Sequence, residues 1–420
     1  MRASPPLSSD CMDYVAMRRT ASDPAIKLAC DESMSEAKTE ADSWEAFRER
    51  MPITSRYAYF DHAAVAPLSQ TVRQAMQDWL AQAVEVGDVA WPQWSATVEG
   101  TRGTAAQLIN ASTNEIALVP NTTTGIGLVA EGLPWRAGDN VVTLANEFPS
   151  NQYPWLNLGS RGVETRRVPV TGVAVDLNRI AEHCDERTRV ISVSWVGYAS
   201  GWRVDLDELA SLAHERGSLL FVDAIQGLGV FPLDVEKTEI DFLAADGHKW
   251  MMGPEGAGML YVRSCHLDQL RPLLVGWNSV AQSHDYQRIE LHFRPSAARF
   301  EGGSQNMVGM AGFGASLREL TELGAGYQGG AVATRVLEVT DYAVRRLQEI
   351  GASIVSQRDA DHRSGIVAFD LPGRDLAEVR RRCLRGNVVL SCRGGWLRIA
   401  PHAYNNEDDV ERLVEILDGN

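Results

Sequence analysis

Short apolar runs that alternate with amphipathic helical segments constrain the fold of this chain more than any other feature. These runs, rich in β-branched residues, span 116–120, 140–144, 189–194, 219–223, 240–245 and 258–262. Strands that are apolar on both faces are typical of parallel sheets covered by helices. The alternation therefore predicts an α/β fold in which a mostly parallel sheet carries helices on both faces.

Changes in pattern along the chain predict how it divides into units. Residues 1–43 mix Ser, Pro, Asp and Glu with little apolar periodicity, which is typical of a disordered leader. Residues 44–328 hold an N-terminal segment and the alternating apolar runs, and we expect them to form a large domain. After residue 328 helical segments mix with shorter strands, so residues 329–420 are expected to form a smaller α+β domain.

Charge and cysteine content argue against several classes of partner. The 420-residue chain has 55 acidic and 40 basic side chains, and the resulting formal charge of −15 disfavours nucleic acid or an anionic membrane as partner. No stretch approaches the roughly 18 apolar residues of a membrane span. The 6 cysteines include no C-x-x-C pair, which argues against a metal site and is typical of a cytoplasmic protein.

Two strand ends carry the residues with the clearest chemistry. Asp223 ends one apolar run, and Lys249 follows the next run along the chain. Because the carboxyl ends of parallel strands line the ligand crevice of an α/β sheet, both side chains are expected to point into one pocket. Burial lowers the pKa of a lysine and leaves a nucleophilic amine, while an ionised Asp can hold a pyridine nitrogen protonated.

Each of these residues alone has a simpler interpretation. A strand-terminal Asp is more often a turn former, and a lone Lys is usually a surface cation. However, His248 stands directly before Lys249, and the flanking glycines permit a ligand to approach the backbone closely. The combination favours a functional site.

This region resembles the lysine segment of the class V aminotransferase family, and the similarity continues from about residue 59 to the C-terminus with several motifs in the expected order. The resemblance implies the type I fold of enzymes that depend on pyridoxal 5'-phosphate. It also implies that Lys249 forms the Schiff base with this cofactor, that Asp223 pairs with the pyridinium nitrogen, and that Gln226 lies beside the phenolic oxygen.

A phosphate cradle is expected where a strand runs into a helix at Pro120-Asn-Thr122-Thr123-Thr-Gly. The N–H groups and hydroxyls at a helix N-terminus suit an anion, although a simple Thr N-cap is the alternative. The resemblance implies that Thr122 and Thr123 bind the phosphate and that His248 lies near it.

Phe148, in the run Glu147-Phe-Pro, stands where the desulfurases of this family carry a histidine that stacks on the cofactor ring. The resemblance to kynureninase-like members implies that Phe148 supplies the stacking plane instead, with an ordinary core Phe as the alternative. A phenyl ring cannot move protons, so acid–base work is expected to fall largely on Lys249 or another side chain.

Further residues are assigned by the same resemblance. Arg398 matches the arginine that binds the substrate carboxylate, for which a planar guanidinium is well shaped. Tyr198 aligns with a residue that reaches cofactor or substrate, or else is a buried Tyr bonded to a backbone carbonyl. Ser304 matches a hydroxyl that reaches the partner's phosphate across the interface of a homodimer with shared active sites. Arg393 is expected to be an exposed or salt-bridged arginine without a special role.

The reaction itself is less constrained. The resemblance implies an enzyme that takes a small amino-acid substrate through an external aldimine to transamination, epimerisation or elimination at Cα or Cβ. A cysteine desulfurase needs a nucleophilic Cys on a mobile loop. Cys392 stands instead at the end of an expected strand and is interpreted as a small buried hydrophobe. Cysteine desulfurase, related to selenocysteine lyase, and a cofactor-binding protein without turnover remain the alternatives.

Overall fold

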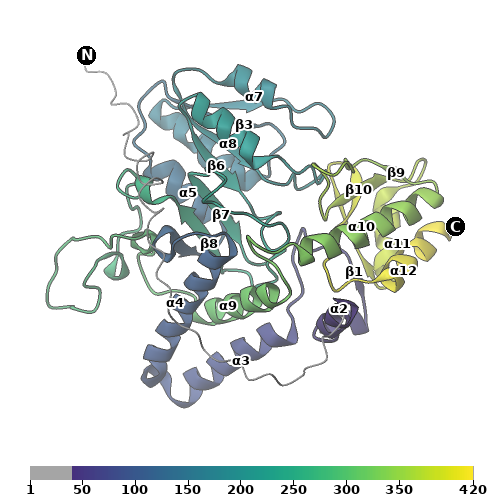
Figure 1. Cartoon of the computed structure of the whole chain (residues 1–420), viewed down its shortest axis with the longest axis horizontal. Helices are drawn as coiled ribbons and strands as arrows, with labels where there is room; N and C mark the ends of the chain where they lie inside the picture. The colour runs from purple at the N-terminus through teal and green to yellow at the C-terminus, as the bar shows by residue number, and fades with distance from the viewer. Residues whose placement is uncertain (1–39, 420) are drawn as a thin grey trace, which may run out of the picture.

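The computed structural model describes residues 40–419 (Figure 1). Residues 1–39 of the expected leader lie outside this range, and residues 40–43 form the first turn of helix α2, Glu40–Glu49. In the described part of the chain, no helix has both the length and the apolar character to cross a membrane.

A seven-stranded sheet forms the centre of the large unit, with the strand order β2-β8-β7-β6-β5-β3-β4. Strands β3 to β7 pair in parallel, whereas β8 is antiparallel to both of its neighbours, so the predicted mostly parallel sheet is confirmed. Its strands are β2 (Ile116–Val119), β3 (Asn140–Leu144), β4 (Glu164–Val168), β5 (Thr188–Ser194), β6 (Leu219–Asp223), β7 (Phe242–Asp246) and β8 (Gly258–Val262). Sequence reasoning missed β4, because this edge strand is partly exposed and polar.

Helices cover both faces of the sheet, as the apolar pattern of the strands predicts. Along β6, Leu219 and Phe221 join one apolar cluster while Leu220 and Val222 join the other, because successive side chains point to opposite faces. One cluster includes α5 and α6, and the other includes α4, α7, α8 and α9. These helices are α4 (Trp91–Leu108), α5 (Thr122–Gly132), α6 (Tyr153–Asn157), α7 (Leu177–His183), α8 (Leu206–Glu215) and α9 (Met307–Glu322). Helix α3, Gln70–Glu85, packs against α9.

The C-terminal unit is a four-stranded antiparallel sheet in the order β12-β13-β10-β9, with three helices. Its elements are α10 (Ala331–Glu349), β9 (Ser353–Ile354), β10 (Val367–Asp370), α11 (Leu376–Arg385), β11 (Val388–Val389), β12 (Ser391–Arg393), β13 (Trp396–Ile399) and α12 (Glu407–Asp418). Strand β1, Ala58–Tyr59, pairs in parallel with β11, and Ala58 and Phe60 are buried in the core of this unit. The N-terminal segment thus packs with the C-terminal residues, a long-range contact that local sequence patterns do not reveal.

A buried ion pair ties α4 to the sheet. Arg102 donates to both carboxylate oxygens of Glu301, with 3.0 Å between Nη2 and Oε2, and to the backbone oxygen of Ile116 in β2. The Leu118 N–H of the same strand also donates to Glu301. Glu99, one turn earlier in α4, approaches the same guanidinium, but its side chain is 57% exposed. Removal of the buried partner would leave an uncompensated charge inside the protein, whereas removal of the exposed one would not.

We therefore expect Glu301→Gln to lower the free energy of unfolding by about 3 to 5 kcal/mol. Glu99→Gln, the same change on the exposed partner, should cost at most about 1 kcal/mol. Urea unfolding followed by circular dichroism measures both. Equal losses in the two variants would contradict the distinction.

Candidate active site

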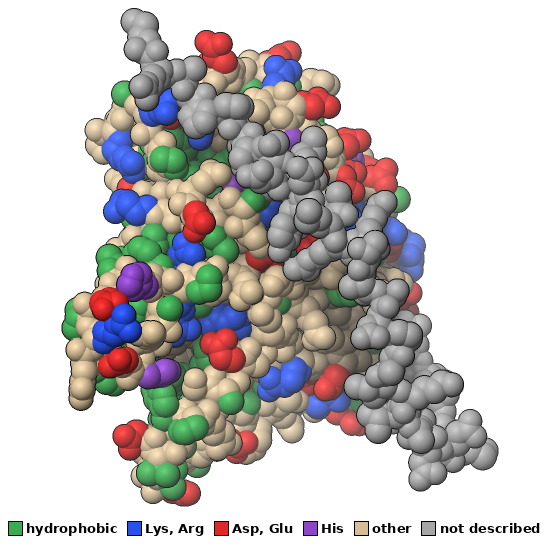
Figure 2. All heavy atoms as spheres, turned by 60° about the vertical axis from the view of Figure 1, so that its left-hand side comes forward, with side chains coloured by type: hydrophobic (Ala, Val, Ile, Leu, Met, Phe, Trp, Pro, Cys, Tyr) green, Lys and Arg blue, Asp and Glu red, His purple; other side chains and the backbone are tan. Residues whose placement is uncertain are grey.

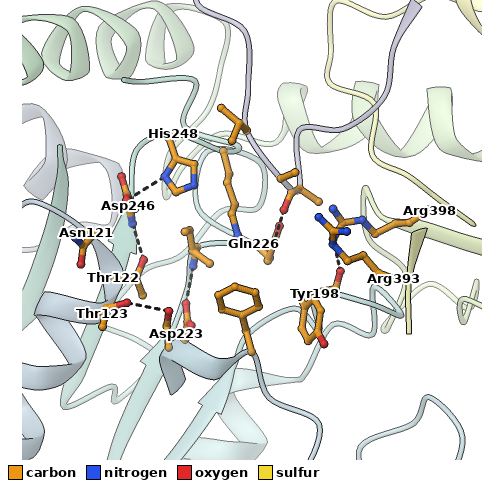
Figure 3. Close-up of a pocket in the computed structure, with 17 residues that line it drawn as sticks. Asn121, Thr122, Thr123, Tyr198, Asp223, Gln226, Asp246, His248, Arg393 and Arg398 are labelled. Atoms are coloured by element: carbon orange, nitrogen blue, oxygen red, sulfur yellow. Dashed lines mark hydrogen bonds and ion pairs between the residues drawn. The ribbon is translucent and has the colours of Figure 1, made fainter. Parts of the chain in front are cut away.

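A cavity of about 420 Å³ lies beyond the carboxyl ends of the central strands and collects most of the predicted site residues (Figure 3). Those that line it are Thr122, Thr123, Phe148, Tyr198, Asp223, Gln226, His248, Lys249 and Arg398. All except Arg398 follow or end a strand of the central sheet whose carboxyl end reaches this edge, which is why residues far apart in sequence meet here. Arg398 comes from β13 of the C-terminal sheet.

Lys249 and Asp223 are buried at the centre of this cavity, with 8% and 3% of their surface exposed. Burial lowers the pKa of Lys249 to about 8; the charge of Asp223 opposes this shift, and those of Arg398 and Arg393 add to it. Burial likewise raises the pKa of Asp223 to about 6, against the effects of the Ile225 N–H and of Lys249. The lysine is therefore far closer to its neutral, nucleophilic form at neutral pH than an exposed lysine is.

An aromatic ring forms one wall beside the lysine. Nζ of Lys249 lies 5.5 Å from the ring centroid of Phe148, which meets Tyr198 edge to face at 5.3 Å. Phe148 is 42% exposed, so the alternative of an ordinary core Phe is wrong. Gln226 is held rigidly, because its amide donates to the Ala63 carbonyl and accepts from the Trp250 indole.

The N-terminus of α5 forms the end of the cavity opposite the arginines (Figure 3). Thr122 Oγ1 accepts from the Asp246 N–H, and Thr123 Oγ1 donates to Ser150 at 2.8 Å. His248 stands beside them, with Nδ1 3.0 Å from Asp246 Oδ2. The N-cap is Asn121, so the alternative of a Thr cap is wrong, and both threonines line the cavity.

Arg398 is only 1% exposed and is held by three segments of the chain. Its Nε donates to Ser391 Oγ at 3.1 Å, Nη2 to Asp61 Oδ1 at 3.0 Å and Nη1 to the backbone oxygen of Tyr198 at 2.5 Å. Ser391 also donates to Asp61. The contribution of Tyr198 here is a carbonyl group rather than a buried hydroxyl.

Sequence reasoning missed several residues that line or support this cavity, including Asp61, Ser391, Ser150 and Asp246. Arg393 is exposed as expected, but it also lines the cavity, which the sequence interpretation did not anticipate. A signal for Asp61 existed in the extended run Tyr57-Ala-Tyr-Phe-Asp61-His-Ala-Ala, which ends in small residues. Its partner stands far along the chain, so no local pattern joins the two.

Ser304 does not join the other predicted residues. It is exposed and lines a separate cavity of about 190 Å³ together with Trp277 and Arg294. Its expected role across a subunit interface stays a prediction.

Cys392 lies in β12 and is half-buried, rather than fully buried as the sequence interpretation had it. Its thiol points to the backbone oxygen of Leu376 in α11, 3.6 Å away, and burial raises its pKa. Successive side chains of a strand face opposite sides, so Ser391 and Arg393 face the site and Cys392 packs against the C-terminal core. No cysteine of the described residues lines the cavity.

The residues that line the cavity fit pyridoxal phosphate. Hydroxyls and the first N–H groups of α5, which lack partners within the helix, suit a phosphate. Nζ of Lys249 has no hydrogen-bond or ion-pair partner among residues 40–419, so it is free to carry the cofactor. The buried Asp223 carboxylate accepts only from the Ile225 N–H in this part of the chain, which leaves it available for a ring nitrogen.

Solved structures of cysteine-metabolising enzymes share the fold of this chain. The cystine C-S lyase C-DES, in complex with cysteine persulfide, matches with a TM-score of 0.81 and 22% identity over 88% of this chain and 99% of that one. The cysteine desulfurase CsdA from Escherichia coli matches with a TM-score of 0.79 and 24% identity over 91% of this chain and 98% of that one.

Sequence comparison gives the family. A probable cysteine desulfurase of Methanothermobacter thermautotrophicus is 30% identical over 89% of this chain and 97% of its own length. An uncharacterized aminotransferase of Bacillus subtilis is 26% identical over 88% of this chain and 96% of its own. The model of the aminotransferase class V family matches residues 58–413. The chain thus belongs to the class V aminotransferase family.

Proposed function

We propose that this enzyme uses pyridoxal phosphate to break a bond at Cα or Cβ of a small amino acid, by transamination, epimerisation or elimination, without attack by a thiol from residues 40–419. One observation carries the proposal: the cavity offers Lys249 as a buried amine with a lowered pKa, while the thiol of Cys392 faces the other side of its strand. The available chemistry is proton transfer rather than attack on sulfur.

The residues of the cavity divide this work between them. The α5 N-terminus, Thr122 and Thr123 would bind the phosphate, and Phe148 would pack on the ring. When bound, pyridoxal phosphate supplies an electron sink for charge that develops at Cα, and Asp223 would keep its ring nitrogen protonated. Lys249 would carry the cofactor and, once released by the substrate amine, move a proton at Cα. Arg398 would orient the substrate through its carboxylate.

Cysteine desulfuration is the second candidate. The relative from Methanothermobacter thermautotrophicus and one from Escherichia coli, each 30% identical, are named probable cysteine desulfurase and cysteine desulfurase. Their names favour cysteine as a substrate. Cysteine could also be the substrate of an elimination, because sulfide is a good leaving group at Cβ.

We also propose a homodimer in the cytoplasm. Large apolar side chains are exposed on the loop that contains Leu274, Tyr286, Ile289 and Leu291, and on the turn after α3 that contains Val89. This loop projects from one side of the molecule in Figure 1, and Figure 2 turns that side forward and shows hydrophobic side chains on it. Exposed apolar side chains of this kind support a subunit interface, with Ser304 nearby in sequence.

Loading of the cofactor should follow the ionisation of Lys249. Only a neutral amine attacks a carbonyl, so we expect the rate of loading onto the cofactor-free protein to rise about tenfold between pH 7 and pH 9 and then level off. Asp223→Asn removes the charge that raises the lysine pKa, so its midpoint should lie at lower pH. Stopped-flow absorbance measures the rate. A rate that still climbs above pH 10 would contradict the lowered pKa.

Products from L-cysteine separate the two candidate reactions. Elimination gives sulfide, pyruvate and ammonia, whereas desulfuration gives alanine and a persulfide on the enzyme. We expect sulfide and pyruvate, with no persulfide, and we expect Cys392→Ser to retain most of the activity, because its side chain lies outside the cavity.

Product chromatography and mass spectrometry of the intact protein report the outcome. Alanine together with a persulfide that Cys392→Ser abolishes would establish desulfuration instead. If a panel of amino acids yields no product although the cofactor binds, the protein is a binder without turnover. Lys249→Ala, which lacks the amine, serves as the inactive control.

A further inference from the structure

We propose that Arg393 is a second ligand for the substrate α-carboxylate. Asp61 neutralises the positive charge of Arg398, and Arg393 supplies a positive charge for the carboxylate in its place. This inference rests on the proposed function, because it assumes that an amino acid occupies the cavity. It assigns a binding role to a residue that the sequence interpretation treated as an exposed neighbour.

The guanidinium of Arg398 is already committed to the protein. Each of its three nitrogen atoms donates a hydrogen bond, to Ser391, to the Tyr198 carbonyl and to Asp61. The Asp61 contact is an ion pair in which the arginine side chain is 1% and the Asp side chain 13% exposed. Arg398 and Asp61 together therefore form a fixed pair without net charge, with only the remaining N–H groups left for a ligand.

The other charges of the cavity wall are also compensated. Asp223 interacts with Lys249, and Asp246 lies 3.0 Å from the imidazole of His248. In contrast, Arg393 has no carboxylate within ion-pair distance among residues 40–419, and its hydrogen bond goes to the backbone oxygen of Cys392 at 2.9 Å. Lys249 also lacks a carboxylate at ion-pair distance in this part of the chain, but the charge of Asp223 acts on it. Arg393 is the other cation of the cavity without an ion-pair partner among these residues.

A carboxylate that bound to the neutral Asp61–Arg398 pair would bring one negative charge into a largely buried place. Such a charge is costly unless a partner offsets it. Arg393 stands beside Arg398 in Figure 3, and its charge adds to the lowering of the Arg398 pKa, which burial mainly causes. It is thus close enough to share the ligand.

The backbone presents Arg393 to the cavity by a tight hairpin. Arg393 ends β12 and pairs with Trp396 of β13. Between them Gly394 and Gly395 have φ of 59° and 87°, values that glycine adopts without strain and that a two-residue type I′ turn requires. The arginines lie at the opposite end of the cavity from the α5 N-terminus, so Arg393 is not placed to bind the cofactor phosphate (Figure 3).

Glycine and glycinamide test the assignment, because they differ mainly in the carboxylate charge and neither has a side chain. We expect Arg393→Gln to raise the dissociation constant of glycine about tenfold and to leave that of glycinamide unchanged. Arg381→Gln is the matched control, since Arg381 is an exposed arginine of α11 outside the cavity that pairs with Glu378. Calorimetry is run with and without pyridoxal phosphate, so the assignment is tested whether or not the cofactor loads.

Asp61→Asn provides the complementary test of the charge balance. This variant frees the charge of Arg398, so it should bind glycine more tightly, and combination with Arg393→Gln should return the affinity to within about threefold of the unsubstituted protein. Thermal unfolding checks that the variants fold. If Asp61→Asn does not fold, Arg393→Lys replaces it, and we expect the retained charge to preserve part of the affinity.

Two results would overturn the proposal. Equal weakening of glycine and glycinamide by Arg393→Gln would show that the residue does not bind the carboxylate. Unchanged glycine binding with weaker binding of L-aspartate, but not of L-asparagine, would assign Arg393 to an acidic substrate side chain. Failure of the proposed function has a separate signature, the absence of product from every amino acid of the panel in the unsubstituted protein.

Discussion

The ion pair between Arg398 and Asp61 joins residues 337 positions apart and fixes how the parts of this molecule meet. Asp61 follows the strand that packs into the C-terminal unit, and the Tyr198 carbonyl that also binds Arg398 comes from the large unit. The next residue, His62, bonds to the Ala400 carbonyl and the Tyr404 hydroxyl, so the same short segment is held on both sides. A buried charge requires such partners, and therefore the substrate end of the site exists only when all these segments are folded together.

The need of buried charges for partners also explains the part of the site that holds Lys249. Asp223 and Lys249 are both buried, and burial raises the pKa of Asp223 to about 6 and lowers that of Lys249 to about 8. The charge of each residue stabilises the charge of the other and so limits both shifts. The sheet makes this possible, because its carboxyl edge brings the ends of several strands together while helices on both faces exclude water. The reactive amine is thus a consequence of where the strand ends, and not of the lysine alone.

Much of the fold could be predicted from local patterns. The strands of the central sheet that are apolar on both faces were all found, because an unbroken apolar run is a local signal. The polar edge strand β4 and the antiparallel direction of β8 were missed, because exposure removes the apolar signal and direction is set by connections across the sheet. In the site, the motif residues other than Ser304 line one cavity, whereas Asp61 and Ser391 were missed because they act through a partner that no local pattern identifies.

The sequence by itself determined the class of fold, the lysine and aspartate at neighbouring strand ends, and the threonines at the start of α5, because periodicity and spacing act over a few residues. Only the tertiary structure decided which charges compensate one another. It paired Asp61 with Arg398, left Arg393 without an acidic partner among the described residues, and turned the thiol of Cys392 toward α11. These outcomes depend on contacts between distant segments, whose electrostatic and packing energies exist only after the chain has brought them together.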